Sequence, residues 1–190
     1  MKLNQNIPTL FTFFRILLIP IFVVVFYMPP SGKAIACGIF IIAAITDWLD
    51  GFLARKLMQT SAFGQFLDPV ADKLLVVVAL VMVVSEYQSM FITLPAAVII
   101  GREIAVSALR EWMSQLGKRV KISVIYVAKV KTVMQLISLA MLILYTPGSY
   151  SHYILYIGSG LLIISAVLTI WSMVVYLKSA WPDLTLGQNQ

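Results

Sequence analysis

The sequence predicts an all-α integral membrane bundle of six transmembrane helices. The 190 residues are 61% hydrophobic and only 12% charged, whereas an ordinary soluble chain is about half apolar and about a quarter charged. The apolar residues fall into six long runs without the alternation that is typical of strands. Each run approaches the roughly 20 residues that a helix needs to cross a bilayer. Residues 1–190 are expected to form a single membrane domain.

The six expected spans follow one another with short connections. The polar start of the chain is expected to form a short segment along the membrane interface, and the residues after Trp181 are expected to form a frayed tail. The spans are Phe11–Met28, Lys33–Leu57, a third that begins between Ala62 and Phe66 and ends near Val84, Phe91–Trp112, Val124–Tyr145 and Tyr153–Leu177.

Basic residues gather on one side of the expected membrane. Lys or Arg occurs at the N-terminus, around the turn between the second and third spans (Arg55 and Lys56), in the fourth connection and in the tail. On the other side, the first connection has only Lys33, and the third and fifth connections carry none. Basic loops tend to stay in the cytoplasm, which predicts that both termini are cytoplasmic. The net charge of +6 favours contact with anionic membrane lipids or an anionic substrate. The sequence carries no nucleic-acid-binding motif, and its single cysteine excludes an internal disulfide.

Four of the eight acidic residues, Asp47, Asp50, Asp68 and Asp72, lie in one short segment. Asp47 and Asp50 are three residues apart, and Asp68 and Asp72 are four apart. The two carboxylates of each pair therefore share a helical face. Two antiparallel helices could direct all four toward one another, and anions so close need compensation. Hard Mg²⁺ or Mn²⁺ ions suit such oxygen ligands. The alternative is a solvated loop, but ionisable residues inside a span cost about 2.5–3.5 kcal/mol each, which favours a function.

This segment resembles the signature of the CDP-alcohol phosphotransferase family. The matching positions are Asp47, Asp50, Gly51, Ala54, Arg55, Gly64, Asp68 and Asp72. Three further stretches, NIPTLFTFFRILLIPIF, LPAAVIIGREIAVSALREWM and AKVKT, resemble the bacterial phosphatidylglycerophosphate synthase branch of the family. The resemblance covers nearly the whole chain. It implies a six-helix membrane domain that usually forms a homodimer, in the bacterial cytoplasmic (inner) membrane. The distribution of basic residues predicts that the aspartate segment, and so the active site, faces the cytoplasm.

The resemblance also implies a reaction, in which the phosphatidyl group of CDP-diacylglycerol is transferred to sn-glycerol 3-phosphate with release of CMP. Two Mg²⁺ or Mn²⁺ ions would be held by the four aspartates, and Asp72 would also be the general base. The residues assigned by resemblance to the CDP end of the donor are Gly51, Ala54, Arg55 and Ser61. The residues expected to border the nucleotide are Pro8, Thr9 and Thr12, for which ordinary helix-start chemistry is the alternative.

The phosphate of the acceptor should need cations of its own. Arg110, Lys129 and Lys131 lie in the fourth and fifth expected spans and are the preferred candidates, with snorkelling to the interface as the alternative. Arg102 could join them or form a buried ion pair with a neighbouring glutamate. Arg15, in the first span, could serve a substrate or a lipid head group.

Two alternative functions remain open at this point. The signature concerns binding of the donor and does not identify the acceptor. Serine, inositol phosphate or another acceptor could therefore replace glycerol phosphate. A cation transporter would also place carboxylates in spans. It would predict acids near mid-bilayer in several spans and an inverted repeat, whereas here the acids crowd one edge and no repeat is visible.

Overall fold

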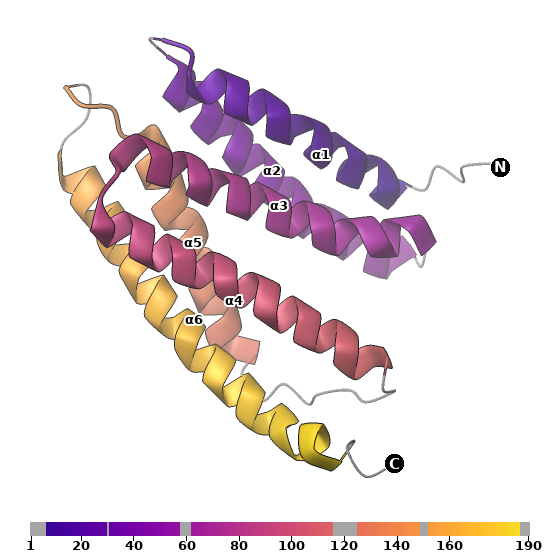
Figure 1. Cartoon of the computed structure of the whole chain (residues 1–190). Coiled ribbons are helices and arrows are strands. Elements are labelled where there is room, and N and C mark those ends of the chain that lie inside the picture. The colour runs from indigo at the N-terminus through magenta and orange to yellow at the C-terminus, as the bar shows by residue number, and fades with distance from the viewer. Residues whose placement is uncertain (1–6, 30, 58–61, 116–124, 149–151, 187–190) are drawn as a thin grey trace. The chain divides into compact units, whose positions relative to one another are not determined.

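The computed structural model of the chain is all-helical, with no strand among the residues that it describes (Figure 1). The backbone is described for residues 7–29, 31–57, 62–115, 125–148 and 152–186, and side chains for 12–29, 31–46, 70–71, 73–109, 111–113, 129–148 and 152–178. The helices are α1 (Ile7–Phe26), α2 (Gly32–Leu57), α3 (Ala62–Tyr87), α4 (Met90–Gln115), α5 (Ile125–Leu144) and α6 (His152–Leu186).

The helices correspond one to one with the predicted spans, and the all-α prediction is confirmed. The largest differences lie at the ends of the chain. Helix α1 begins at Ile7, so only residues 1–6, which lie outside the described part, could form a separate interfacial segment. Helix α6 continues to Leu186, so the prediction of a frayed tail after Trp181 is wrong up to that residue. A hydropathy pattern marks where apolar residues stop, whereas backbone hydrogen bonding can continue a helix beyond that point.

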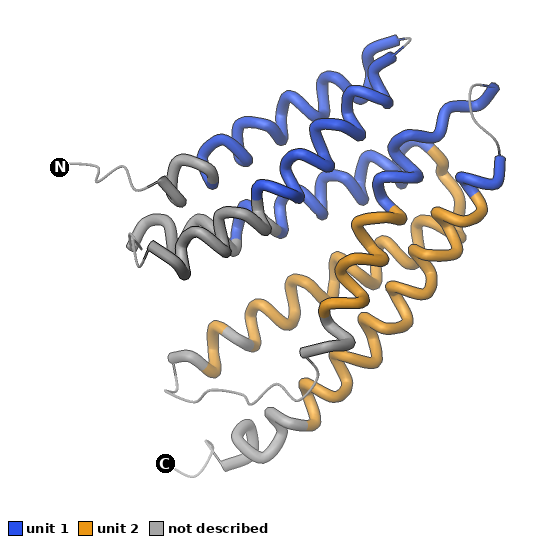
Figure 2. The backbone as a smooth tube through the Cα atoms, turned by 180° about the vertical axis from the view of Figure 1, so that it is seen from behind, with its two compact units in different colours: residues 1–86, 139–155 blue, residues 87–138, 156–190 orange. Residues whose placement is uncertain are grey.

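The chain forms two compact units, shown in blue and orange in Figure 2. Unit 1 consists of residues 1–86 and 139–155, so it holds α1, α2 and nearly all of α3. Unit 2 consists of residues 87–138 and 156–190, so it holds α4, most of α5 and most of α6. Each unit is therefore described by itself.

In unit 1, α1 packs against α2 through a stripe of buried residues at helical spacing. The stripe on α1 includes Phe22 and Phe26, whose rings lie 6.1 Å apart, and Phe22 also approaches Phe40 of α2 at 6.4 Å. The connection between these helices is short, so α2 returns alongside α1 and ends near the place where α1 begins (Figure 1). Helix α3 starts there too, because residues 58–61 alone separate it from α2.

The opposite end of unit 1 is held by a charged contact and a tight backbone approach. Lys33, in the first turn of α2, forms an ion pair with Glu86 near the end of α3, and its ammonium lies 5.9 Å from the ring centroid of Phe26. Beside it, the amide of Gly32 donates to the carbonyl of Met28 at 2.9 Å. A Cβ atom at Gly32 would overlap the carbonyl oxygen of Val25.

Gly32→Ala is therefore expected to destabilise the α1–α2 connection by about 1–3 kcal/mol, since the backbone has to shift to relieve the overlap. Thermal unfolding in detergent should show a lower midpoint than the parent protein. Gly38→Ala on the same helix is the matched control, because a Cβ there meets no atom within 4 Å. Equal midpoints for the two variants would contradict the expectation.

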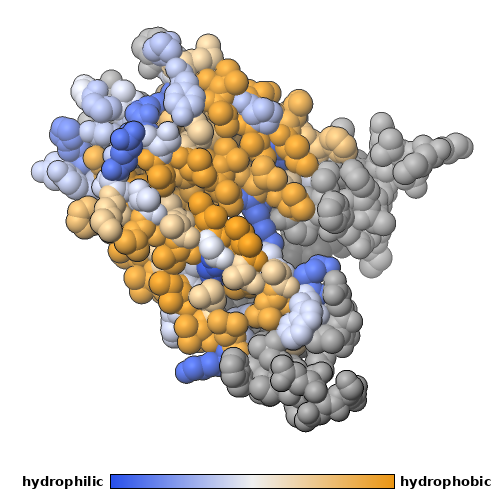
Figure 3. Space-filling view, in the orientation of Figure 1, coloured by the Kyte–Doolittle hydropathy of each residue, from blue (hydrophilic) through white to orange (hydrophobic). Residues whose placement is uncertain are grey.

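In unit 2, helix α6 turns a polar face inward and an apolar face outward. Helix α6 buries Ser165, Thr169 and Ser172 on one face, while Val167 and Trp171 on the opposite side are exposed. Apolar residues also cover much of the face of the molecule seen in Figure 3. A water-soluble protein normally has the reverse distribution, because burial of apolar area drives its folding.

Two helices in the described part of the chain are long and apolar enough to cross a membrane, Met90–Met113 in α4 and His152–Lys178 in α6. Helices α5 and α6 also approach closely, since the hydroxyl of Ser138 donates to the carbonyl of Gly158 at 2.7 Å. Interhelical hydrogen bonds and small residues at contacts are typical of helix packing in lipid. The length, composition and inside-out polarity of these helices fit a membrane protein.

Candidate active site

The four aspartates of the signature lie at the end of unit 1 where α2 finishes and α3 begins. Asp47 and Asp50 fall in the last turns of α2, and Asp68 and Asp72 fall in the first turns of α3. The helical backbone that the spacing argument needs is therefore present on both sides of the connection. The side chains of all four lie outside the described part of the structure, so the metal site stays a prediction.

The predicted donor-binding residues fall at the same end of unit 1. Gly51, Ala54 and Arg55 lie on α2, and Pro8 and Thr9 lie in the first turn of α1, where proline is favoured. The side chains of these residues are outside the described part, as is the whole of Ser61. Their predicted roles therefore remain untested.

Two predicted residues on α1, Thr12 and Arg15, are described, and both are enclosed by protein. Thr12 is 0% exposed and Arg15 is 1% exposed. They are three apart and continue the buried stripe of Ile19 and Phe22 toward the start of the helix. The predicted role of Arg15, toward a substrate or a lipid head group, stays a prediction.

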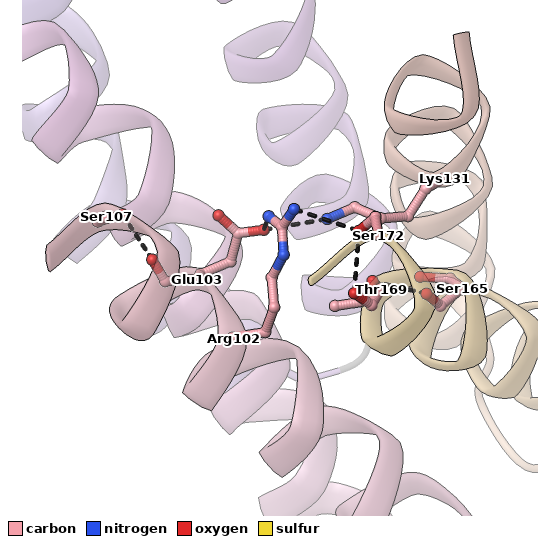
Figure 4. A network of polar contacts seen from close by, with 7 residues as sticks. All are labelled: Arg102, Glu103, Ser107, Lys131, Ser165, Thr169 and Ser172. Atoms are coloured by element: carbon pink, nitrogen blue, oxygen red, sulfur yellow. Dashed lines mark hydrogen bonds and ion pairs between the residues drawn. The ribbon is translucent and has the colours of Figure 1, made fainter. Parts of the chain in front are cut away.

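In unit 2, three charged side chains from α4 and α5 meet (Figure 4). Glu103 Oε1 accepts a hydrogen bond from Arg102 Nη1 at 2.9 Å and another from Lys131 Nζ at 3.2 Å. Lys131 is only 4% exposed, and the other two side chains are mostly buried. One carboxylate oxygen thus joins two cations, and with all three groups ionised the cluster carries one net positive charge.

Helix α6 contacts the other Nη atom of the Arg102 guanidinium. Arg102 Nη2 donates to Ser172 Oγ at 3.3 Å, and the Ser172 hydroxyl donates to the backbone carbonyl of Thr169 at 2.9 Å (Figure 4). The Thr169 hydroxyl in turn donates to the carbonyl of Ser165 at 2.6 Å. The network therefore draws on α4, α5 and α6, which together make up most of unit 2.

The structure separates the cations that were predicted to bind the acceptor phosphate. Lys131 and Arg102 lie in the network, and the expected pair between Arg102 and a neighbouring glutamate is present. Lys129 is exposed, and a spacing of two residues turns it about 200° around the helix from Lys131. The Arg110 side chain lies outside the described part. The structure therefore brings Lys131 and Arg102 together at Glu103, and their predicted role in binding the acceptor stays a prediction.

Sequence reasoning did not single out Ser172 or the bridging role of Glu103. A signal for Ser172 exists, because Ser165, Thr169 and Ser172 recur at spacings of four and three inside an otherwise apolar run. Such a stripe marks an inward-facing polar face in a membrane helix. The bridge made by Glu103 has no comparable signal, because its partner Lys131 lies on another helix.

Comparison with known proteins decides the family. A family model described as CDP-alcohol phosphatidyltransferase matches residues 5–171. The chain belongs to the CDP-alcohol phosphatidyltransferase family. The matched region contains the whole aspartate signature together with Arg102, Glu103 and Lys131, so the family prediction from the signature is confirmed.

Bacterial members of the CDP-alcohol phosphatidyltransferase family resemble this chain over nearly its whole length. The chain is 53% identical over 180 residues to the CDP-diacylglycerol–glycerol-3-phosphate 3-phosphatidyltransferase of Shigella flexneri serotype 5b, with 94% of this chain and 97% of that protein covered. The proteins of the same name from Shigella boydii serotype 4 and Escherichia coli show the same identity and coverage.

Proposed function

We propose that the protein is a membrane enzyme that transfers the phosphatidyl group of CDP-diacylglycerol to sn-glycerol 3-phosphate. The observation that carries the proposal is the 53% identity, over 94% of the chain, to enzymes named for this reaction. In the reaction, the 1-hydroxyl oxygen of glycerol phosphate bonds to the phosphatidyl phosphorus. The bond from that phosphorus to the CMP oxygen breaks, and phosphatidylglycerol phosphate and CMP are released.

The four aspartates are proposed to form the catalytic end of unit 1. The buried stripe of α2 runs through Ala36, Phe40 and Ala43, and the same helical period reaches positions 47, 50 and 54. On α3, Ala71 and Leu75 are buried, and positions 68 and 72 each lie three residues before one of them. On this helical period, we propose that all four aspartates lie on the faces of α2 and α3 that carry these buried residues.

The chemistry of this donor set suits a divalent ion, because four carboxylates supply only hard oxygen ligands. Two bound Mg²⁺ or Mn²⁺ ions would offset the pyrophosphate charge and stabilise the entering and leaving oxygens. Asp72 would accept the proton of the acceptor hydroxyl as general base. Arg55 would contact the donor phosphates through its planar fork, while Gly51 and Ala54 would leave room for the nucleotide.

The acceptor phosphate is proposed to bind Lys131 and Arg102. Both are cations held away from bulk solvent, and the cluster around them keeps a net positive charge with Glu103 ionised. Hydrogen bonds from charged donors to phosphate are about twice as strong as neutral ones. Serine lacks a phosphate, so these cations favour a phosphorylated acceptor over it.

All six helices are proposed to span a bacterial cytoplasmic membrane, with both termini and the aspartate end of unit 1 on the cytoplasmic side. The distribution of Lys and Arg among the connections supports this orientation. Water-soluble glycerol phosphate and CMP would then enter and leave from the cytoplasm, while the diacylglycerol chains stay in lipid. By family resemblance, the enzyme is proposed to act as a homodimer.

Purified protein in detergent, given CDP-diacylglycerol and a panel of acceptors, tests the reaction and the metal together. CMP release is expected with glycerol phosphate and not with serine or inositol phosphate. EDTA should abolish release, and Mg²⁺ or Mn²⁺ should restore it. Release with serine in place of glycerol phosphate would overturn the acceptor assignment, and full activity in EDTA would overturn the metal assignment.

A further inference from the structure

Glu103 is a carboxylate placed between two groups that are proposed to bind an anion. It follows Arg102 directly on α4, and neighbours in sequence do not face each other on a helix, so their ion pair is not of the helix-stabilising kind. The same oxygen reaches Lys131, 28 residues away on α5. The position of Glu103 is therefore explained by the junction of α4 and α5 rather than by the stability of α4 alone.

The contacts of Glu103 leave both cations able to bind a second anion. An ammonium has three N–H donors and a guanidinium has five. Glu103 takes one from each cation, and Ser172 takes one more from Arg102. Arg102 Nε is buried and has no hydrogen-bond partner among the described residues. The Glu103 carboxylate can thus bridge Arg102 and Lys131 while each cation keeps further N–H donors for a second anion.

Charge explains why a bridge is needed. Arg102 Nη1 and Lys131 Nζ both contact one oxygen, so they lie no farther apart than the sum of 2.9 Å and 3.2 Å. Two cations at that separation repel each other, and both have lost most of their contact with solvent. A carboxylate between them offsets the repulsion while no phosphate is bound.

Ser172 fixes the other side of the guanidinium. Its hydroxyl hydrogen is directed at the Thr169 carbonyl at 2.9 Å, so a lone pair is left to accept from Arg102 Nη2 at 3.3 Å. Ser172 itself is 6% exposed, so packing restricts its rotation. Together, Glu103 and Ser172 hold both Nη atoms of Arg102.

We propose that Glu103 and Ser172 are positioning residues of the acceptor site, which hold Arg102 and Lys131 at a separation suited to the oxygens of one phosphate monoester. The inference rests on the proposed function, because it takes these two cations as the phosphate-binding groups. It adds that the affinity for glycerol phosphate depends on two side chains that carry no positive charge.

Steady-state kinetics with each substrate varied in turn tests the proposal. Glu103→Gln and Ser172→Ala are each expected to raise KM for glycerol phosphate about 10-fold, the size of one lost charged hydrogen bond, with KM for CDP-diacylglycerol unchanged. Glu103→Asp should restore part of the loss, since it keeps the charge. Calorimetric titration with glycerol phosphate, in the absence of donor, should show the same order of affinities.

Matched controls are present on the same helices. Glu111 is exposed on α4, and Ser165 is buried on the same face of α6 with a hydroxyl oxygen that has no hydrogen-bond partner among the described residues. Glu111→Gln and Ser165→Ala are expected to keep both KM values of the parent enzyme. If Glu103→Gln does not fold, Ser172→Ala and Glu103→Asp still decide the question.

The outcomes separate this inference from the proposed function. If Arg102→Ala and Lys131→Met raise KM for glycerol phosphate while Glu103→Gln and Ser172→Ala do not, the positioning roles are wrong and the acceptor site stands. If the two cation variants leave KM unchanged, the acceptor site itself is wrong. A lower KM in Glu103→Gln would show that the carboxylate competes with phosphate and would overturn the positioning role.

Discussion

Replacing Asp72 with asparagine is expected to abolish CMP release while leaving the protein folded in the membrane. The change keeps the shape of the side chain but removes the negative charge and nearly all of its basicity. The amide can neither accept the hydroxyl proton of the acceptor nor balance a divalent cation as a carboxylate does. General base catalysis alone contributes typically 10²–10⁴-fold, and a weakened metal site would add to the loss.

Release of CMP from CDP-diacylglycerol and glycerol phosphate, measured at saturating Mg²⁺ or Mn²⁺, checks this expectation. Asp183→Asn is the control, because Asp183 lies near the end of α6, far from the signature in sequence, and should retain activity. An Asp72→Asn enzyme with the activity of the parent would remove Asp72 from the general-base role. A loss that excess metal ion fully restores would assign Asp72 to metal binding alone.

Lys131→Met is expected to raise KM for glycerol phosphate about 10- to 100-fold, which corresponds to the loss of one buried charged hydrogen bond. Methionine fills a similar volume, so packing of α5 should be preserved. Glu103 keeps Arg102 as its partner at 2.9 Å, so no buried carboxylate is left unpaired. The variant therefore removes the net positive charge of the cluster without the larger penalty of an uncompensated charge.

The measurement is KM for each substrate with the other held at saturation. KM for CDP-diacylglycerol should stay within about 2-fold, because the donor is proposed to bind in unit 1. Lys178→Gln, an exposed change on α6, is the control for the loss of one positive charge. Lys129→Gln should have a smaller effect than Lys131→Met, because Lys129 is exposed. An equal rise in both KM values for Lys131→Met would argue against the acceptor role.

The helices and the family could be predicted from the sequence because their signals are local. Runs of apolar residues gave six elements whose bounds agree with the structure within a few residues, except at the end of α6. The spacing of the aspartates depends only on residues within one helical hairpin. Family membership followed from that spacing and is confirmed by the family model over residues 5–171.

The acceptor candidates could be only partly predicted, because their arrangement depends on packing between helices. Lys129 and Lys131 looked equivalent in sequence, and only the burial of α5 distinguishes them. The sequence allows Arg102 either an ion pair or a binding role. The structure shows the ion pair with Glu103, and the binding role stays a prediction. Nothing in the sequence near Ser172 indicates its contact with Arg102, because that contact depends on how α6 packs beside α4.

The polar face of α6 has a consequence for judging natural variation in this chain. Replacing Ser165, Thr169 or Ser172 by alanine or valine would raise the hydropathy of a helix that already qualifies as a membrane span. Judged by hydropathy alone, each change makes α6 a more apolar membrane span and looks harmless. Only the change at Ser172 removes a contact with Arg102. We therefore expect a variant at Ser172 to insert normally and to accumulate to normal levels. Its expected defect is weak binding of the soluble substrate at cellular concentrations.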